Sequence, residues 1–516
     1  MLAAGLASAI ALALPDIGGV THAAGRPRRQ AAASTAQHGA RPRPRARPAR
    51  LPQAVLTISP GAATTSVPAS YFGLSTEYWA LPLFERNMPV FERVLSLMHI
   101  SGDGPLVLRI GGDSADHSFW APRPRNMPGW AFALTPAFLA RLKTLVRRDH
   151  VRLIVDLNLV TDTPLTAATW ARAAETSLPR GSIVGFEVGN EPDIYNRSYW
   201  VAMVSRSPLQ ARPLPLELTP DSYVDDFNAY ARVLGEGAPD VPLIGPAVAH
   251  PKVGLPWIST LVDDDRPELG AVSAHLYPYS ECVKPGSHAY PTIARVLSRQ
   301  ASAGLAKDVA GAVAVAHRAG LRFRLTEINS VTCGGKAGVS NTFATALWAP
   351  DALFALMRAG VDGVNLHVRA SAINAPFSLT RNGLQARPLL YGLLMFARTL
   401  GPGARLVRLH LAAPRSLNLS AWAVRLRGGR LHVLVIDKSG RSVRVDLRLP
   451  ASGPATVQRL LAPAARSRSQ VTLDGQELGP DGRWTGTPRT GTIARSRRGY
   501  ELTVPRLSAA LVAVRS

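Results

Sequence analysis

Two carboxylates follow short apolar runs of the sequence, where they could carry out acid–base and nucleophilic chemistry. Glu191 follows IVGFEVG and Asn190, in a run that begins at residue 183, and Glu327 follows LRFRLT, which begins at residue 321. Runs of this kind predict buried β-strands. Enzymes built on parallel strands place their catalytic groups just beyond the carboxyl ends of those strands. A pair of carboxylates in this setting is what glycoside hydrolysis requires.

The two glutamates would have different tasks in that reaction. One carboxylic acid protonates the leaving oxygen, and one carboxylate faces the anomeric carbon. We expect Glu327, beside the hydroxyl of Tyr277 and near Arg109, to remain ionised as the nucleophile. We expect Glu191 to hold its proton through burial and repulsion from Glu327, and to act as general acid and then as base. Asn190 could donate a hydrogen bond to the sugar hydroxyl next to the reacting carbon.

Other polar residues stand at the ends of other apolar runs, and their shared position predicts that they converge on one cleft. They are Glu77, Arg109, Asp113, Asp116, His275, Tyr277 and His367. Hydrolysis at a metal centre is the alternative chemistry, because His275, His367 and Asp116 could be ligands. The sequence has no HExxH motif or comparable ligand spacing. We therefore expect neither a metal nor a cofactor.

An alternation of strand-like and helix-like segments must position these residues. Strands are expected at 71–79, 106–110, 151–157, 183–188, 241–245, 271–276, 321–326 and 361–367. Helices are expected between and after them, at 82–98, 136–149, 166–176, 219–235, 256–262, 290–319, 341–359 and 384–400. This repeated unit of a strand and a helix predicts an α/β fold, a (β/α)8 TIM barrel, over residues 66–400.

The pattern changes near Gly401. Short alternating runs separated by Gly, Pro, Asp and Ser follow, and they predict an antiparallel β-sandwich domain over residues 401–516. An early strand at 51–59 precedes the barrel and has no helix after it. We therefore expect residues 51–65 to supply an N-terminal strand to the C-terminal β-sandwich.

The first fifty residues differ in composition from the rest of the chain. Residues 1–24 are rich in Leu and Ala, which resembles the apolar part of a secretory signal, either cleaved or retained as an anchor. Residues 25–50 contain eight arginines and no acid, and they predict a disordered linker. We expect a secreted, extracytoplasmic or surface-held monomer. No other apolar stretch is long enough to predict a membrane span.

The formal charge of the chain is +24. A strongly basic protein attracts acidic partners, and this charge suits an acidic substrate. The arginine-rich linker has no interleaved aromatic residues, so we expect no nucleic-acid partner. The expected partner is a carbohydrate.

The motifs around the polar residues resemble those of the heparanase-like β-glucuronidases, glycoside hydrolase family 79. The resemblance extends from Leu51 to Ser516. GNEPD is shared by a large clan of retaining glycosidases, and the remaining motifs are more specific to this family. The motifs are YFGLSTEYW (71–79), LRIGGDSADHSFW (108–120), GNEPD (189–193), SAHLYPY (273–279), LTEINS (325–330) and, in the sandwich, DGQELGPDGRWTG (474–486). The resemblance implies a retaining β-glycosidase that acts on β-linked glucuronides.

The resemblance also implies a role for individual positions. Glu191 would be the acid/base and Glu327 the nucleophile, with Arg109 and His275 in support. The substrate contacts would be Asn190 on the sugar, Tyr277 on the nucleophile, Glu77 and Asp113 on hydroxyls, and the backbone N–H groups of Gly334 and Gly335 on the uronate carboxylate. Phe377 is a departure, because the family tends to place a tyrosine near that carboxylate. Two other functions stay open: a related enzyme for a neutral sugar, and a non-catalytic carbohydrate-binding barrel.

The chain has two cysteines, too few for a disulfide framework or a zinc site. Cys282 follows the sixth expected strand and Cys333 the seventh, so their loops should lie side by side at the active-site face. Exported proteins meet oxidising conditions in which disulfides persist. We therefore predict a Cys282–Cys333 bond that fixes the loop carrying Gly334 and Gly335. Two independent buried thiols are the alternative.

Overall fold

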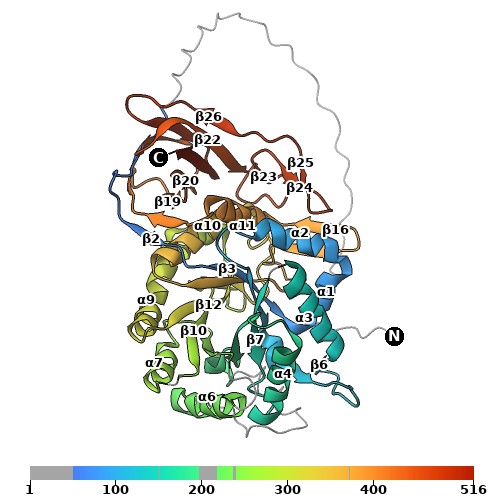
Figure 1. Cartoon of the computed structure of the whole chain (residues 1–516). Helices are drawn as coiled ribbons and strands as arrows, with labels where there is room; N and C mark the ends of the chain where they lie inside the picture. The colour runs from blue at the N-terminus through green and yellow to red at the C-terminus, as the bar shows by residue number, and fades with distance from the viewer. Residues whose placement is uncertain are drawn as a thin grey trace, which may run out of the picture. The chain divides into compact units, whose positions relative to one another are not determined.

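Eight parallel strands close into a barrel in the computed structural model of the chain (Figure 1). The structure describes residues 50–149, 151–196, 218–235, 240–265, 267–370 and 372–515, so the predictions for residues 1–49 lie outside it. All eight predicted strands are confirmed. In order around the barrel they are β10 (Leu269–Leu276), β12 (Arg322–Ile328), β14 (Gly363–His367), β3 (Phe72–Glu77), β4 (Val107–Gly111), β7 (Arg152–Leu157), β8 (Ile183–Val188) and β9 (Leu243–Val248).

The barrel strands are buried on both faces, because one face fills the barrel and the other meets the helices. In β8, for example, every residue except Val184 is buried. β9 begins at Leu243, two residues later than predicted, because Pro242 has no N–H for the strand ladder.

Helices surround the barrel (Figure 1). Four of them begin at a proline, whose missing N–H costs nothing in the first turn. The helices are α1 (Leu81–Phe84), α2 (Met88–Met98), α3 (Pro136–Asp149), α4 (Pro164–Ser177), α6 (Pro220–Gly235), α7 (Leu255–Asp263), α8 (Ile293–Val296), α9 (Ala303–Arg318), α10 (Phe343–Arg358) and α11 (Pro388–Thr399). Short 3-10 turns are η1 (Tyr78–Ala80), η2 (Glu85–Asn87), η3 (Gly112–His117), η4 (Pro192–Ile194) and η5 (Arg299–Ala301). Within the described part of the chain, no helix has the length and apolarity needed to cross a membrane.

Three predicted helices are wrong in their extent. The segment 82–98 is divided before α2, because Asn87 has a φ of −143° and a ψ of 62°, outside the helical region. The segment 290–319 is divided at Ser302, with a φ of −126° and a ψ of −74°. The segment 384–400 begins as β16 (Gly383–Ala386), which pairs with β15 (Phe377–Thr380), so α11 starts only at Pro388.

Two sheets form the predicted β-sandwich, and their facing sides share an apolar core that includes Leu56, Val433 and Val445. The first sheet has the order β18 (His410–Ala412), β1 (Gln53–Thr57), β21 (Val443–Arg448) and β27 (Tyr500–Val504). The second has the order β2 (Thr64–Ser66), β17 (Arg405–Val407), β19 (Leu419–Leu426), β20 (Arg430–Asp437), β28 (Ser508–Arg515), β22 (Ser452–Leu461) and β23 (Thr472–Leu473), with β26 (Gly491–Ile493) beside β22. The predicted fold class is confirmed, including the N-terminal strand, β1.

Short strand pairs complete the fold. The pairs are β5 (Ser118–Trp120) with β6 (Phe132–Leu134), β11 (Tyr279–Ser280) with β13 (Val331–Thr332), and β24 (Glu477–Leu478) with β25 (Trp484–Thr485). The pair of β11 and β13 lies in the loops that follow β10 and β12 and matters for the site below.

A buried ion pair joins the barrel helix α10 to the sandwich. Asp351 of α10 accepts hydrogen bonds from Lys438 Nζ at 2.6 Å and from Trp422 Nε1 at 2.9 Å. The side chains of Lys438 and Asp351 are 1% and 4% exposed. Phe354, almost one helical turn further on, stacks on Trp422 with ring centroids 5.6 Å apart. The charged pair is thus enclosed by apolar contacts.

Removing one partner of this pair should destabilise the fold strongly. In Lys438→Met the Asp351 carboxylate stays buried without its counter-charge, and we expect a loss of about 3–5 kcal/mol in the free energy of unfolding. Lys438→Met combined with Asp351→Asn removes both charges and should recover much of that loss. Urea unfolding of the single and double variants measures both effects. A double variant less stable than either single variant would contradict this account.

Candidate active site

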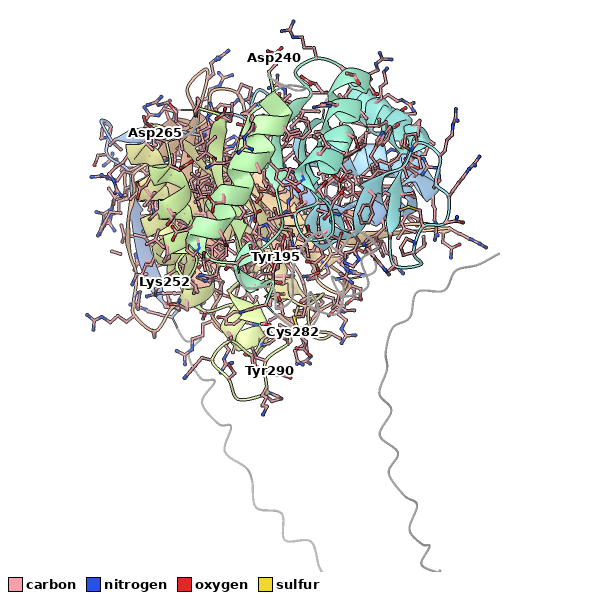
Figure 2. The ribbon with its side chains drawn as sticks, turned by 90° about the horizontal axis from the view of Figure 1, so that it is seen from below. Tyr195, Asp240, Lys252, Asp265, Cys282 and Tyr290 are labelled. Atoms are coloured by element: carbon pink, nitrogen blue, oxygen red, sulfur yellow. A yellow bond between two sulfur atoms is a disulfide. The ribbon has the colours of Figure 1, made fainter. Side chains whose placement is uncertain are left out.

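The predicted site residues lie together at the carboxyl ends of the barrel strands. Glu77 ends β3, Glu327 stands one residue before the end of β12, and Asn190 and Glu191 follow β8. Figure 2 shows Tyr195, Lys252, Cys282 and Tyr290, from loops that follow strands, at one side of the view, and Asp240 and Asp265, from loops that precede strands, at the other. Because the strands are parallel, the site residues share one end of the barrel.

Glu327 is held by two strong hydrogen bonds. Its Oε1 accepts from the Tyr277 hydroxyl at 2.6 Å, and its Oε2 accepts from Arg109 Nη1 at 3.0 Å. Burial by itself would raise the pKa of Glu327. The positive charges of His367, His275 and Arg109 outweigh burial, and the hydrogen bond from the tyrosine adds to them. Together they lower the pKa of Glu327 to about 2, so this carboxylate is ionised at neutral pH.

Arg109 is fully buried and binds two further carboxylates. Its Nε lies 2.7 Å from Glu187 Oε2, and its Nη2 lies 2.8 Å from Asp156 Oδ2. Burial raises the pKa of Asp156 well above its usual range despite Arg109, and the neighbouring Glu187 adds to the rise. Burial would also raise the pKa of Glu187, but the charges of Arg109 and His275 lower it. The arrangement therefore fits a protonated Asp156 and an ionised Glu187.

His367 connects Glu327 to the opposite side of the site. Burial raises the pKa of Tyr277, so its hydroxyl keeps the proton that it donates to Glu327. The tyrosine oxygen then accepts from His367 Nδ1 at 2.9 Å, and His367 Nε2 lies 3.6 Å from Glu77 Oε1. Burial would lower the pKa of His367, but the charges of Glu327 and Glu77 raise it. A charged imidazole thus links Glu77, Tyr277 and Glu327.

Glu191 has a left-handed backbone, with φ 55° and ψ 53°. Pro192 disfavours the right-handed helical region for the residue before it, and the Glu191 N–H donates to the Ala247 carbonyl at 3.0 Å. Sparsely populated conformations of this kind are concentrated at functional sites. The Glu191 side chain is 18% exposed, and its Oε1 lies 2.9 Å from His275 Nδ1. Its conformation aims the carboxyl group at Glu327, and oxygens of the two groups lie within 4.8 Å of each other.

Asn190 and Asp113 form the part of the site suited to sugar hydroxyls. Asn190 Oδ1 accepts from Arg109 Nη2 at 2.9 Å, and its Nδ2 donates to Asp113 Oδ1 at 3.2 Å. An amide nitrogen carries two hydrogens, so one remains for a ligand. Burial raises the pKa of Asp113 well above its usual range, and the charges of Glu77 and Glu191 add to the rise. A protonated Asp113 can both donate to and accept from a hydroxyl.

The loop after β12 corrects one prediction. Cys333, Gly334 and Gly335 have positive φ angles of 57°, 76° and 86°. The Gly335 N–H donates to the Thr332 carbonyl at 3.2 Å, so it already serves the turn and is not available to a carboxylate. Within the described residues the Gly334 N–H has no hydrogen-bond partner, and nothing lies within 4 Å of a Cβ placed there. The Gly334 N–H is therefore open to a ligand, its binding of a carboxylate stays a prediction, and Gly335 shapes the turn.

The Cys282–Cys333 disulfide is present, with sulfurs 1.99 Å apart and Cα atoms 6.0 Å apart. It joins the loops after β10 and β12, as the adjacency of these strands predicts. Two further contacts tie the same loops together. Tyr279 of β11 lies opposite Val331 of β13 in a parallel pair. Lys336 Nζ also forms an ion pair with Glu281 Oε1 at 2.9 Å.

Loss of the disulfide should loosen this loop and destabilise the fold. The two cysteines are 51 positions apart, and closure of such a loop stabilises a protein by roughly 4 kcal/mol in the chain-entropy estimate. In Cys282→Ser/Cys333→Ser we expect a lower midpoint of urea unfolding and faster amide exchange at Gly334. The exchange of amides in the sandwich is the internal control. Unchanged exchange at Gly334 would mean that β11, β13 and the Lys336 ion pair hold the loop by themselves.

One group of described residues brings donor atoms close enough for a metal ion. Glu191, His275 and Glu327 offer atoms within 4.8 Å of one another. These atoms belong to the carboxylate pair itself, and each is already engaged: His275 Nδ1 with Glu191, and Glu327 with Arg109 and Tyr277. The contacts are those that an acid–nucleophile pair needs, and we interpret the group in that way.

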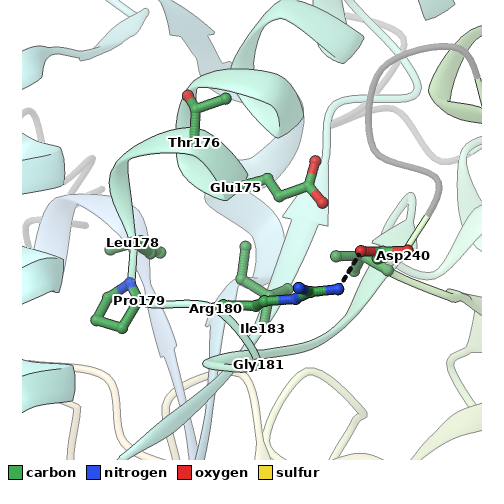
Figure 3. A pocket seen from close by; sticks show the side chains of 9 residues that line it. Glu175, Thr176, Leu178, Pro179, Arg180, Gly181, Ile183 and Asp240 are labelled. Carbon is green, nitrogen blue, oxygen red and sulfur yellow. Dashed lines mark hydrogen bonds and ion pairs between the residues drawn. The ribbon is translucent and has the colours of Figure 1, made fainter.

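A hollow of about 620 Å³ lies at the other end of the barrel (Figure 3). It is bordered by the loops that precede β8 and β9, where Arg180 forms an ion pair with Asp240 at 3.0 Å. None of the predicted site residues lines it. The chemistry described above is therefore confined to the carboxyl ends of the strands.

The contacts of two site residues could not be predicted from the sequence. His367 was expected at a strand end, as a cleft residue or a metal ligand, and its contacts with Tyr277 and Glu77 depend on strand order. Glu187 was not predicted as a site residue. Its signal was a charged residue inside the apolar run IVGFEV, since a buried carboxylate needs a partner.

The chain is similar to several known glycosidases. Residues 417–511 match the C-terminal β domain of glycosyl hydrolase family 79. The chain is 24% identical over 461 residues to a β-glucuronidase of Aspergillus niger, covering 78% of this chain and 82% of that protein. A 4-O-α-L-rhamnosyl-β-D-glucuronidase of Fusarium oxysporum shares the fold, with a TM-score of 0.72 and 18% identity over 90% of this chain and all of that one. An α-L-arabinofuranosidase of Thermotoga maritima does so with a TM-score of 0.64 and 17% identity, over 90% of this chain and all of that one.

Proposed function

We propose that the chain is a member of glycoside hydrolase family 79 and hydrolyses β-linked glucuronides with retention of configuration, by a double displacement between Glu191 and Glu327. The match of its C-terminal domain to that family and its similarity to two glucuronidases support the proposal. The observation that carries this proposal is the spacing of the two carboxylates, within 4.8 Å between oxygens. Retaining glycosidases hold their carboxyl groups about 5 Å apart, whereas inverting enzymes leave room for a water, at roughly 6.5–9.5 Å.

Each glutamate acts twice in the proposed cycle. In the first step a Glu327 oxygen bonds to the anomeric carbon, the glycosidic C–O bond breaks, and the Glu191 proton passes to the leaving oxygen. In the second step Glu191 takes a proton from water, the water oxygen bonds to the anomeric carbon, and the bond to Glu327 breaks. NMR of the first-formed product should show the β-anomer. An initial α-anomer would contradict the proposal.

The substrate carboxylate is proposed to bind the Gly334 N–H. A glycine lets a ligand approach the backbone closely, and this one has open space beside it. In Gly334→Ala the methyl group enters that space, and we expect KM for an aryl β-glucuronide to rise about tenfold through the lost charge-assisted hydrogen bond. KM for the matching aryl β-glucoside should change little.

Gly181→Ala is the matched control for that variant. Gly181 has a φ of 75°, against 76° for Gly334, and it too has nothing within 4 Å of an added Cβ, but it lies at the opposite end of the barrel. It therefore reports the strain of an alanine at positive φ without touching the site. If both variants change the KM for the glucuronide equally, the Gly334 N–H does not bind the substrate carboxylate.

A neutral-sugar glycosidase is the second candidate, and the position of Phe377 favours it. Phe377 is 1% exposed and packs against Phe84 and Phe91, with ring centroids 6.0 and 6.4 Å apart, so it offers nothing to a carboxylate. Rates on aryl β-glucuronide, β-glucoside and β-xyloside separate the candidates. Preference for the glucuronide supports the main proposal, and turnover of any of the three excludes a non-catalytic barrel. We further propose that the enzyme is exported and acts as a monomer.

A further inference from the structure

Outside the reacting centre, Arg369 is a cation at the mouth of the site that has no acidic partner among the described residues. Arg369 is exposed, and its guanidinium carbon lies 5.8 Å from the centroid of the half-buried Trp79 ring. Within the described residues its guanidinium forms no hydrogen bond and no ion pair. By contrast, Lys336, in the loop after β12, is paired with Glu281. A guanidinium placed over an aromatic ring keeps its in-plane N–H groups available for a carboxylate.

Arg369 and Trp79 extend the site outward from two adjacent strands. His367 lies opposite Ser75 where β14 pairs with β3, and the Thr76 hydroxyl donates to the Val368 carbonyl at 2.8 Å. His367 and Glu77 make contact at the strand ends, 3.6 Å apart. Arg369 lies two residues after His367 and Trp79 two residues after Glu77, and Arg369 and Trp79 make the next contact. The second pair thus forms a rim beyond the first.

The barrel order tells which end of a bound sugar this rim faces. In the ring of eight, β14 lies four strands from β8 and β3 lies four strands from β9, and Glu191 follows β8. Glu191 protonates the leaving group in the proposed mechanism, so the leaving group lies on its side. The rim at Arg369 and Trp79 therefore faces the opposite end of the reacting sugar, its non-reducing side.

The carboxylate of the reacting sugar is assigned to a different place. Gly334 belongs to the loop after β12, which meets the chain beyond β14 where the Asn374 N–H donates to the Gly334 carbonyl at 3.1 Å. Arg369 leans the other way, onto Trp79 beyond β3. Gly334 and the contact of Arg369 with Trp79 thus lie on opposite sides of β14.

We propose that Arg369, held by Trp79, binds the acidic group of a second sugar attached to the non-reducing side of the reacting glucuronide. This inference rests on the proposed function and makes the substrate an acidic oligo- or polysaccharide. Trp79 is a positioning residue here, because it acts through the guanidinium that it supports. The contact is exposed, so added salt should weaken it.

Three substrates test the proposal: 4-nitrophenyl β-glucuronide, the same compound with a second glucuronic acid on O4, and the same compound with a neutral glucose on O4. The wild type should prefer the acidic disaccharide to the neutral one. Arg369→Ala should lower kcat/KM on the acidic disaccharide about tenfold and leave the other two substrates unchanged. Arg369→Lys, which keeps the charge and loses the planar fork, should fall between. Trp79→Phe should retain the preference and Trp79→Ala should weaken it.

Arg152→Ala is the control, because Arg152 is an exposed arginine at the first residue of β7, at the opposite end of the barrel. An unchanged preference in Arg369→Ala would overturn the proposal. An equal loss on the monosaccharide would also overturn it, since Arg369 would then serve the reacting sugar. A wild type that cleaves the monosaccharide but neither disaccharide would do the same.

A wild type inactive on all three substrates would instead count against the proposed function. Calorimetric titration of the acidic and neutral disaccharides then tests Arg369 by itself. Tighter binding of the acidic disaccharide by the wild type, lost in Arg369→Ala, supports the proposal. Equal affinities overturn it.

Discussion

Glu327→Gln should lower kcat on an aryl β-glucuronide by about 10⁵-fold, the order of loss seen when a catalytic nucleophile is removed. The amide has nearly the shape of the carboxylate, so the fold should survive. It cannot form the glycosyl ester, and its NH₂ group cannot accept the hydrogen bond that Arg109 Nη1 makes to Glu327 Oε2. Glu175→Gln, a partly exposed glutamate at the opposite end of the barrel, is the matched control and should be fully active. Residual activity above about one hundredth of wild type would place the nucleophile elsewhere.

The same variant has a pH signature. The pKa of Glu327 is lowered from 4.5 to about 2 in the folded protein. A carboxyl group with a depressed pKa stabilises the fold above its unfolded pKa, and that contribution is lost as the pH falls from about 4.5 toward 2. We expect the unfolding midpoint of the wild type to fall in this interval more steeply than that of Glu327→Gln. Parallel curves would mean that the Arg109 and Tyr277 contacts do not favour the ionised form.

Glu191→Ala should slow hydrolysis of a glucuronide with a poor leaving group by about 10²–10⁴-fold, the usual contribution of a general acid. With an activated aryl leaving group the first step needs no acid, and the second step, which needs the base, becomes limiting. Added azide needs no base and can enter the space left by the side chain. We expect azide to accelerate the variant on the activated substrate and to leave the wild type unchanged.

The configuration of the azide product separates the two glutamates. Attack on a glycosyl–Glu327 ester gives the β-glycosyl azide, because two inversions retain the configuration. An α-azide from Glu191→Ala would mean that azide had replaced the nucleophile, and the two roles would have to be exchanged. No acceleration at any azide concentration would remove the acid/base role from Glu191.

The elements and the proximity of Glu191 and Glu327 could be predicted from the sequence because their signals are local. Each barrel strand is a short apolar run, and apolar runs mark buried strands wherever they stand. Glu191 and Glu327 stood out because each follows such a run, and parallel strands bring their carboxyl ends to one edge. The sandwich was equally visible from its alternating runs, and β1 from its position before the barrel.

Helix extents were less predictable. Asn87 and Ser302 interrupt segments whose apolar spacing is helical, and their backbone angles are set by packing that the spacing does not contain. The availability of the Gly335 N–H was equally hard to predict, because this N–H closes a turn by donating to the Thr332 carbonyl. These backbone conformations involve residues that are close in the sequence, but contacts with the rest of the fold fix them.

The contacts that tune the site were decided only by tertiary structure. His367 contacts Glu77, 290 positions earlier in the sequence, and Tyr277, 90 positions earlier. Arg109 contacts Glu187, 78 positions later, and Glu327, 218 positions later. The spacing of apolar residues that marks a strand or helix involves only residues close together in the chain, so it can be recognised in the sequence. Hydrogen bonds between distant side chains depend on strand order, register and the closing of the barrel, which no short run of residues encodes.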